Sequence, residues 1–153
     1  MSKLGVSQRG QALPPSPIRK LIPFADQAKK RGIKVYHLNI GQPDIETPPE
    51  FWRAVKDYSN KILAYGNSQG MAGYLDKLAG YYTKLGLDIN QDDIIVTTGG
   101  SEAIIFAMTI ICDPGDEIII FEPFYTNYNG FAIQSGIDLV PITTTAETGF
   151  HIP

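Results

Sequence analysis

The sequence predicts an α/β protein built on a parallel sheet, and the prediction rests on the order of segments in its last third. Residues 93–98, 117–122 and 138–144 are short apolar or β-branched runs of the kind that forms strands. Residues 101–112 and the stretch through 130–135 lie between them and have helical composition. Strands that alternate with helices are typical of parallel sheets covered on both faces. Since only these three strands are predicted, both edges of the sheet would remain open, as expected of the front part of a larger fold.

The first forty residues predict an irregular arm, a helix and a short strand. Residues 1–17 contain three prolines among Gly, Ser and Gln, which favours irregular structure. Residues 18–31 carry apolar side chains at helical spacing and end in basic residues before Gly32, a favourable end for a helix. Residues 35–40 predict a strand, which Gly41 would end.

The middle of the chain predicts two helices joined by a loop. Thr47 is a candidate N-cap and Pro48 suits the first helical position, so we expect a helix that continues to Tyr58. Residues 64–70 form a polar, glycine-bearing loop. Residues 73–85 then carry an apolar stripe at helical spacing, which predicts a helix packed on a core.

Composition excludes several classes of function. The chain has 153 residues, a formal charge of −3 and a pI near 5.3, which argue against binding nucleic acid or other polyanions. Cys112 is the single cysteine, and His37 and His151 have no neighbours at ligand spacing, so we expect no disulfide and no metal site. No segment has the features of a leader or a membrane span, so we expect a cytoplasmic protein that does not bind membranes.

The turn from Thr97 to Glu102 is the strongest local candidate for a binding site. Gly99 and Gly100 allow the backbone to turn sharply, and Ser101 is expected to cap the following helix. The amides at a helix N-terminus favour anions, most often phosphate. A well-made turn in any α/β fold has the same features, and the spacing matches neither a dinucleotide fingerprint nor a P-loop. Because no Lys or Arg follows Lys84, a phosphate here would need amides, hydroxyls or a cation from elsewhere.

Four motifs in a fixed order extend the interpretation. They are Asn39-Ile40-Gly41-Gln42-Pro43-Asp44 followed by Thr47-Pro48, Tyr65 five residues before Gly70, the turn 99–101 before an apolar helix ending in Asp113-Pro114-Gly115-Asp116, and a strand running into Glu122-Pro123-Phe124-Tyr125. Together they resemble the class I/II aminotransferases, pyridoxal-phosphate enzymes of fold type I that include aspartate aminotransferase. The resemblance covers the chain from about Pro15 to Pro153.

The resemblance implies an incomplete fold type I structure. Residues 1–45 would be the N-terminal arm, a helix and a small-domain strand, and residues 46–153 the start of the large cofactor-binding domain, truncated. The parent enzyme would move an amino group between an amino acid and a 2-oxo acid as a homodimer, with pyridoxal 5'-phosphate as cofactor.

The resemblance also implies roles for individual cofactor-binding residues. Gly99, Gly100 and Ser101 would hold the cofactor phosphate through backbone amides and the serine hydroxyl. Tyr125 would stack on the pyridine ring. Tyr65 would reach across the dimer interface to the cofactor phosphate of the other subunit.

On the substrate side, the same comparison places Gly41 beside the substrate carboxylate and Ile18 in an arm folded over the substrate. Tyr128 would lie behind the residues that touch the cofactor. The lysine that forms a Schiff base with the cofactor lies well downstream in the family, and no Lys follows Lys84 here. The resemblance therefore implies that this chain has no catalytic residue and is inactive by itself.

Two alternatives remain open at this stage. One is a non-catalytic α/β module that binds phosphate at the Gly99 turn. The other is a different fold type I pyridoxal-phosphate enzyme, a lyase or a synthase, because the retained residues would bind the cofactor in any of these reactions. The sequence does not indicate which amino acid is the substrate.

Overall fold

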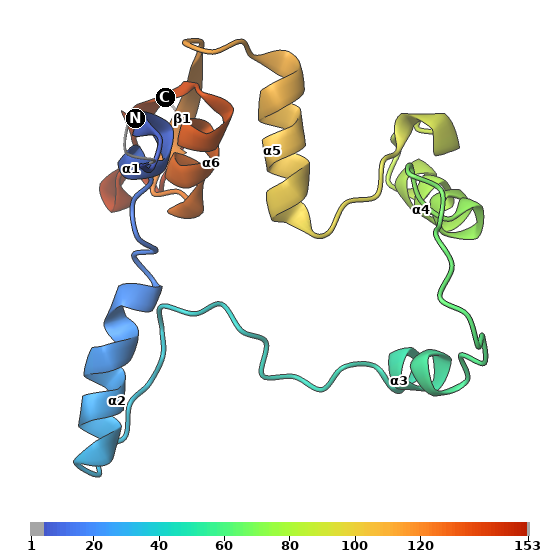
Figure 1. Cartoon of the computed structure of the whole chain (residues 1–153), viewed down its shortest axis with the longest axis horizontal. Helices are drawn as coiled ribbons and strands as arrows, with labels where there is room; N and C mark the ends of the chain where they lie inside the picture. The colour runs from blue at the N-terminus through green and yellow to red at the C-terminus, as the bar shows by residue number, and fades with distance from the viewer. Residues whose placement is uncertain (1–4, 153) are drawn as a thin grey trace. The chain divides into compact units, whose positions relative to one another are not determined.

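The computed structural model describes residues 5–152 (Figure 1). The chain divides into two compact units. One unit combines Met1–Gly41 with Gly99–Pro153, and the other is Gln42–Thr98. The first four residues of the predicted arm, and Pro153, lie outside the described part of the chain.

The first unit contains all of the sheet. Its elements are α1 (Gln8–Ala12), the 3₁₀ helix η1 (Arg19–Leu21), α2 (Ile22–Lys30), α5 (Gly100–Ile111), β1 (Glu117–Glu122), α6 (Asn127–Ser135), β2 (Asp138–Thr143) and the 3₁₀ helix η3 (Ala146–Thr148). The second unit contains α3 (Pro49–Lys56), α4 (Ala72–Lys84) and the 3₁₀ helix η2 (Gln91–Asp93).

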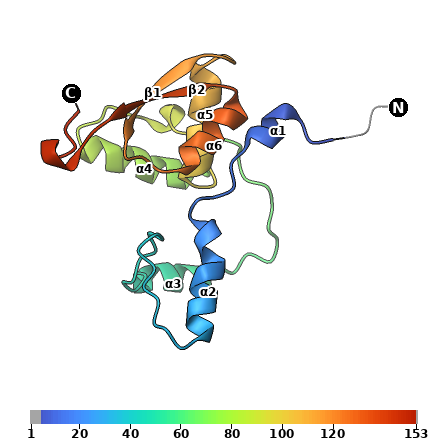
Figure 2. The same cartoon turned by 90° about the vertical axis from the view of Figure 1, so that its left-hand side faces the viewer.

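The predicted parallel pairing is confirmed for two strands. β1 and β2 run parallel in a register that pairs Glu117 with Asp138 and Glu122 with Thr143, and α6 connects them (Figure 2). Such a connection places the C-terminal ends of both strands at one edge, which is where α/β folds commonly bind ligands.

The predictions of strands over residues 35–40 and 93–98 are wrong. Residues 94–97 belong to no strand of the described chain, although Ile94 has extended backbone, and residues 35–40 end in a turn. In the segment 94–97 the Ile94 amide donates to the Gln91 carbonyl at 3.3 Å, and the Val96 amide donates to the Gln69 carbonyl at 2.8 Å. A β-branched run becomes a strand only when a neighbouring strand accepts and donates its hydrogen bonds.

The helices follow the prediction with two corrections. The arm over residues 1–17 was predicted to be irregular, but residues Gln8–Ala12 form α1, whose first turn is capped by the Ser7 hydroxyl. α3 begins at Pro49, its N-cap is Pro48 rather than Thr47, and it ends at Lys56. The reason is steric, because the ring of a proline disfavours the α region for the residue before it. Pro48 is therefore extended, with φ −50° and ψ 136°, and Pro49 takes the first helical position.

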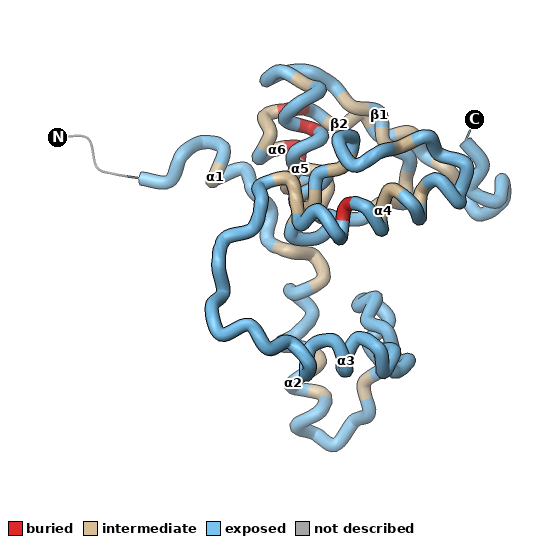
Figure 3. Tube along the Cα trace, turned by 90° about the vertical axis from the view of Figure 1, so that its right-hand side faces the viewer, coloured by how far each residue is buried: buried red, intermediate tan, exposed pale blue. Residues whose placement is uncertain are grey.

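The core is small and lies mainly around α6. Met108, Ala132 and Ile137 are buried together in the first unit, and Leu75 of α4 is buried in the second (Figure 3). The apolar stretch from Ala103 to Cys112 suits a buried helix, but most of α5 is exposed in the described chain, and Ile110 is 77% exposed. α5 is apolar around its circumference, but within the described chain only one face meets other elements.

No helix between residues 5 and 152 combines the length and apolar character that crossing a membrane requires.

Candidate functional site

The chain enters α5 through a turn that only glycine adopts readily. Gly99 has φ +84° and is the N-cap, so the expectation that Ser101 caps the helix is wrong. Because the helix already begins at Gly100, Ser101 has helical backbone and its hydroxyl belongs to the first turn. The first intrahelical bond runs from the Ala103 amide to the Gly99 carbonyl at 3.4 Å. The amides of Gly100 and Ser101 precede it and have no acceptor within the helix.

The loop between β1 and α6 holds Tyr125 in a defined orientation. Asn127 Nδ2 donates to Tyr125 Oη at 2.7 Å, and the Tyr128 amide donates to the Tyr125 carbonyl at 3.0 Å. The rings of Tyr125 and Tyr128 meet edge to face, with centroids 5.6 Å apart and planes at 90°. Tyr125 is still 47% exposed, so its ring is held but accessible.

Further aromatic side chains extend this cluster along α6. Phe124 stacks on Tyr128 at 6.3 Å with an interplanar angle of 11°, and Tyr128 lies 6.2 Å from Phe131. Tyr128 and Phe131 are three residues apart and so share one face of the helix. Together these rings form a continuous aromatic wall beside Tyr125.

A cavity of about 430 Å³ brings the turn and the aromatic wall together. Its lining residues are Gly100, Ser101, Ala103, Ile104, Tyr125, Tyr128 and Phe131. This volume falls within the range of roughly 300–1,000 Å³ that is usual for small-molecule sites. Three of the predicted cofactor residues, Gly100, Ser101 and Tyr125, therefore line one cavity within a single unit.

Three lining residues were missed by the sequence reasoning: Ile104, Phe131 and Ala103, which lies three positions after Gly100. Ile104 lies three positions after Ser101, and Phe131 lies three positions after Tyr128, so each extends a helix face that already carries a predicted residue. Helical spacing from the predicted residues could have identified all three.

The lining carries no charged side chain. The first turn of α5 contains Glu102 and no basic residue. An anion in the cavity would thus be held by backbone amides and the Ser101 hydroxyl, in the positive potential of a helix N-terminus. Residues 5–152 include no group of three or more His, Cys, Asp or Glu side chains placed to hold a metal.

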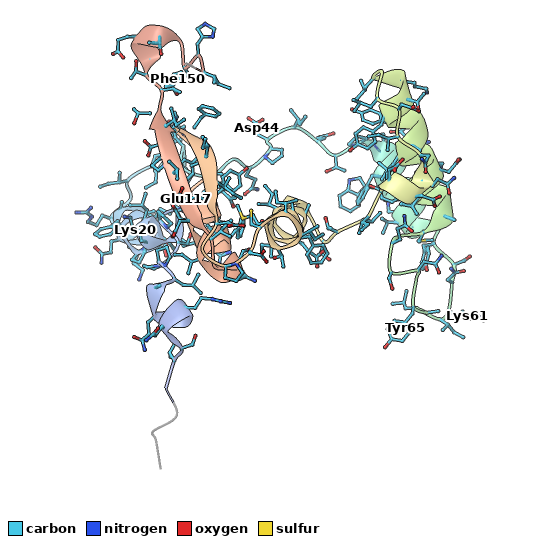
Figure 4. All side chains as sticks on the ribbon, turned by 90° about the horizontal axis from the view of Figure 1, so that it is seen from above. Lys20, Asp44, Lys61, Tyr65, Glu117 and Phe150 are labelled. Carbon is cyan, nitrogen blue, oxygen red and sulfur yellow. The ribbon has the colours of Figure 1, made fainter. Side chains whose placement is uncertain are left out.

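The remaining predicted residues do not line this cavity. Tyr65 belongs to the second unit and is fully exposed at the outer end of the loop before α4 (Figure 4). A methyl group added at Gly41 would meet no heavy atom within 4 Å. The Ile18 carbonyl accepts a hydrogen bond from Asn39 Nδ2 at 3.3 Å, which ties the start of η1 to the segment before Gly41.

Comparison with known proteins identifies the family. A model of the family "Aminotransferase class I and II" matches residues 33–153. The chain belongs to this family. The turn, the aromatic loop and the parallel strands described above all fall within the matched residues.

The chain is similar to aminotransferases of Thermus thermophilus and Thermotoga maritima. The aspartate/prephenate aminotransferase of Thermus thermophilus is 30% identical over 152 residues, which covers 95% of this chain and 38% of the relative. The aspartate aminotransferase of Thermotoga maritima is 32% identical over 151 residues, covering 95% and 39%. The chain thus spans less than two fifths of the length of these relatives.

Solved aminotransferase structures confirm the predicted α/β fold of an incomplete fold type I enzyme. The crystal structure of aspartate aminotransferase from Thermotoga maritima matches with a TM-score of 0.85 at 29% identity, covering 95% of this chain and 39% of that one. Aspartate aminotransferase from Rhizobium meliloti matches with a TM-score of 0.88 at 28% identity, covering 97% and 38%.

Proposed function

We propose that this aminotransferase chain supplies one wall of a pyridoxal 5'-phosphate site. The observation that carries the proposal is the cavity in which the first turn of α5 faces an accessible, oriented tyrosine. When bound, the cofactor supplies an electron-withdrawing ring that stabilises negative charge on a substrate carbon. The chain's own contribution is to bind and orient that group.

The residues present suit the two ends of the cofactor. Gly100 and Ser101 offer first-turn amides and a hydroxyl for the phosphate. A methyl group added at Gly99 or Gly100 would meet no atom within 4 Å, so the turn is open to an approaching anion. At the other end, the face of Tyr125 suits a flat, electron-poor ring, and Phe131 keeps the site apolar.

The whole enzyme is proposed to act as a homodimer in the cytoplasm on an amino acid and a 2-oxo acid. Tyr65 would contribute to the partner's phosphate site, while Gly41 and Ile18 would face the substrate. The names of similar proteins include aspartate, prephenate, LL-diaminopimelate and (5-formylfuran-3-yl)methyl phosphate, so this support extends to the class of substrate and not to one amino acid.

The cavity lining includes no Lys, His, Asp, Glu or Cys side chain. We therefore propose that the 153 residues by themselves bind the cofactor but do not catalyse amino-group transfer. Catalysis in this family needs a positioned nucleophilic lysine, which binding and orientation alone do not replace.

Ligand titrations of the purified chain test the proposal. We expect pyridoxal phosphate to quench the tyrosine fluorescence at concentrations about tenfold lower than pyridoxal, because the phosphate adds charge-assisted hydrogen bonds. Equal affinity for the two ligands would contradict a phosphate site at Ser101. Inorganic phosphate binding as tightly as pyridoxal phosphate would instead favour a phosphate-binding module without a cofactor role.

Mass spectrometry after borohydride reduction tests the proposal that the 153 residues alone do not catalyse amino-group transfer. We expect no stoichiometric adduct on a 16.8 kDa chain, since no lysine lines the cavity. A single-site adduct at full occupancy would show that a lysine at or before Lys84 reacts with the cofactor, and would overturn the proposed inactivity.

A further inference from the structure

A second cavity in the first unit, of about 220 Å³, lies between residues 13–17 of the N-terminal arm and α6. Leu13 and Pro14 line it from the arm, and Asn127, Gly130 and Phe131 line it from the helix. A methyl group added at Gly130 would lie 4.0 Å from Leu13 Cδ2, so the two segments are within van der Waals contact. α1, which precedes these arm residues, also lies beside α6 (Figure 2). We call this space the arm cavity.

The arm cavity shares residues with the proposed cofactor site. Phe131 lines both the arm cavity and the cavity at the first turn of α5. Asn127 lines the arm cavity, and its side chain donates the hydrogen bond that orients Tyr125. The arm therefore lies behind one ring of the aromatic wall and behind the residue that fixes the stacking tyrosine. Because packed side chains move together, a displaced arm would disturb both.

Arg9 fastens the arm to the C-terminal end of α6. Its Nη1 donates to the Gln134 carbonyl at 3.3 Å, and a methyl group added at Gly136 would lie 3.5 Å from its Nη2. The amides of Gly136 and Ile137 donate to carbonyls that precede Gln134, so the Gln134 carbonyl is served by the guanidinium instead. The last turn of α6 contains no basic residue, although the negative end of a helix favours one. Arg9 supplies that charge from the arm.

We propose that Arg9 is a positioning residue for the aromatic wall of the cofactor site. By bonding to the end of α6, it holds residues 13–17 against the helix, and these residues keep Phe131 and Asn127 in the orientation that a flat ligand meets. Arg9 lines neither cavity, so it acts through the arm and not on the ligand. This inference rests on the proposed function, because the wall needs positioning only if it binds the cofactor ring.

Two substitutions of Arg9 separate charge from size. Arg9→Met removes the charge and the donors from a long side chain, whereas Arg9→Lys keeps a charge and donors. We expect the affinities for pyridoxal phosphate and for pyridoxal to fall by the same factor in the Met variant, about three- to fivefold, and to stay within about 1.5-fold in the Lys variant. Their ratio should not change, because the phosphate contacts at the first turn of α5 remain. A loss confined to pyridoxal phosphate would mean that the guanidinium attracts the phosphate directly, and would overturn the positioning role.

A matched control and a ligand-free measurement complete the test. Arg19 is exposed and lines neither cavity, so Arg19→Met should leave both affinities unchanged. Without ligand, the nuclear Overhauser effect between the Leu13 methyl groups and the Gly130 α protons should weaken in Arg9→Met and persist in Arg19→Met. Amide exchange at Ile137, in the turn that ends α6, should accelerate about threefold in Arg9→Met alone.

A second variant approaches the same contact from its apolar side. Leu13→Ala leaves the Arg9 bond in place and removes packing from the arm cavity, so it should lower both affinities and leave their ratio intact. It keeps the test decisive if Arg9→Met does not fold, which thermal unfolding shows. Titrations are done well below the unfolding temperature, where a residue that only stabilises the fold would leave both affinities unchanged.

The outcomes distinguish the two proposals. Unchanged affinities in Arg9→Met, or a persistent nuclear Overhauser effect between the arm and α6, would overturn the positioning role and leave the cofactor site intact. If the unsubstituted chain binds neither pyridoxal phosphate nor pyridoxal, the proposed function fails, and the positioning role fails with it.

Discussion

Asn127 donates a hydrogen bond to the hydroxyl of Tyr125 at 2.7 Å, so the first residue of α6 fixes the aromatic ring of the preceding loop. The perpendicular contact with Tyr128 constrains the same ring from its side. The chain therefore orients Tyr125 with its own side chains, and a flat ligand would bind to a ring that is already in place. Such preorganisation lowers the entropic cost of binding.

Substitution of Tyr125 tests the stacking role. Tyr125→Ala should lower the affinity for both pyridoxal phosphate and pyridoxal by about two- to twelvefold, because aromatic stacking contributes roughly 0.5–1.5 kcal/mol. Tyr125→Phe keeps the ring and should remain within about twofold of the original affinity. Fluorescence titration with both ligands measures the change. A loss confined to the phosphorylated ligand would instead place Tyr125 at the phosphate.

A second prediction concerns pH and the exposed 3₁₀ helix η3. The backbone hydrogen bond at Glu147 and then the Thr145 side chain hold the pKa of the Glu147 carboxyl below its ordinary value. A lowered folded-state pKa means that this carboxylate stabilises the fold above its ordinary pKa, and that the contribution is lost as the pH falls through the folded-state value.

Substitution of Thr145 tests this origin of the shift. Thr145→Val should raise the pKa of Glu147 toward its ordinary value, as followed by NMR titration of the side-chain carboxyl. Thr148→Val is the control, because the Thr148 hydroxyl donates to the Thr145 carbonyl at 2.9 Å rather than to Glu147. A shift of equal size in the control would attribute the effect to the turn as a whole.

The sequence predicted those elements whose signals are local. α4 was predicted within one residue at each end, and β1 matches its predicted bounds, because helical periodicity and a strand flanked by turns lie within the element itself. Residues 35–40 and 94–97 have equally good strand composition, but a strand also needs a partner, which no local pattern supplies.

The residues of the candidate site also differ in whether a local sequence motif identifies them. Gly100, Ser101 and Tyr125 were found because motifs carry them, whereas Phe131 belongs to no motif and is indicated only by its helical spacing from Tyr128. Ser101 was assigned the wrong backbone position, because the positive φ of Gly99 moves the cap two residues earlier. Tyr65 remains a prediction, since its proposed ligand belongs to a second subunit.

The small core around α6 leads to a stability prediction. Met108 is buried against Ala132 and Ile137, so Met108→Ala should lower the free energy of unfolding by about 2–4 kcal/mol through lost burial and a residual cavity. Ile110→Ala, on the 77% exposed side of the same helix, should change it by less than about 0.5 kcal/mol. Urea denaturation followed by circular dichroism measures both. Similar losses in the two variants would mean that the outer face of α5 is also packed in solution.

The two glycines before Ser101 give the most direct test of the turn. Gly99 has φ +84° and open space around it, so Gly99→Ala should be destabilising through backbone strain alone, by about 1–2 kcal/mol. Gly100 is helical with equally open space, so Gly100→Ala should stabilise the chain by roughly 0.5–1 kcal/mol, since alanine loses less backbone entropy in a helix. Urea denaturation compares the pair. If both variants changed the free energy of unfolding in the same direction, the assignment of a positive φ to Gly99 would be wrong. The turn conformation that exposes the first-turn amides of α5 would then be wrong as well.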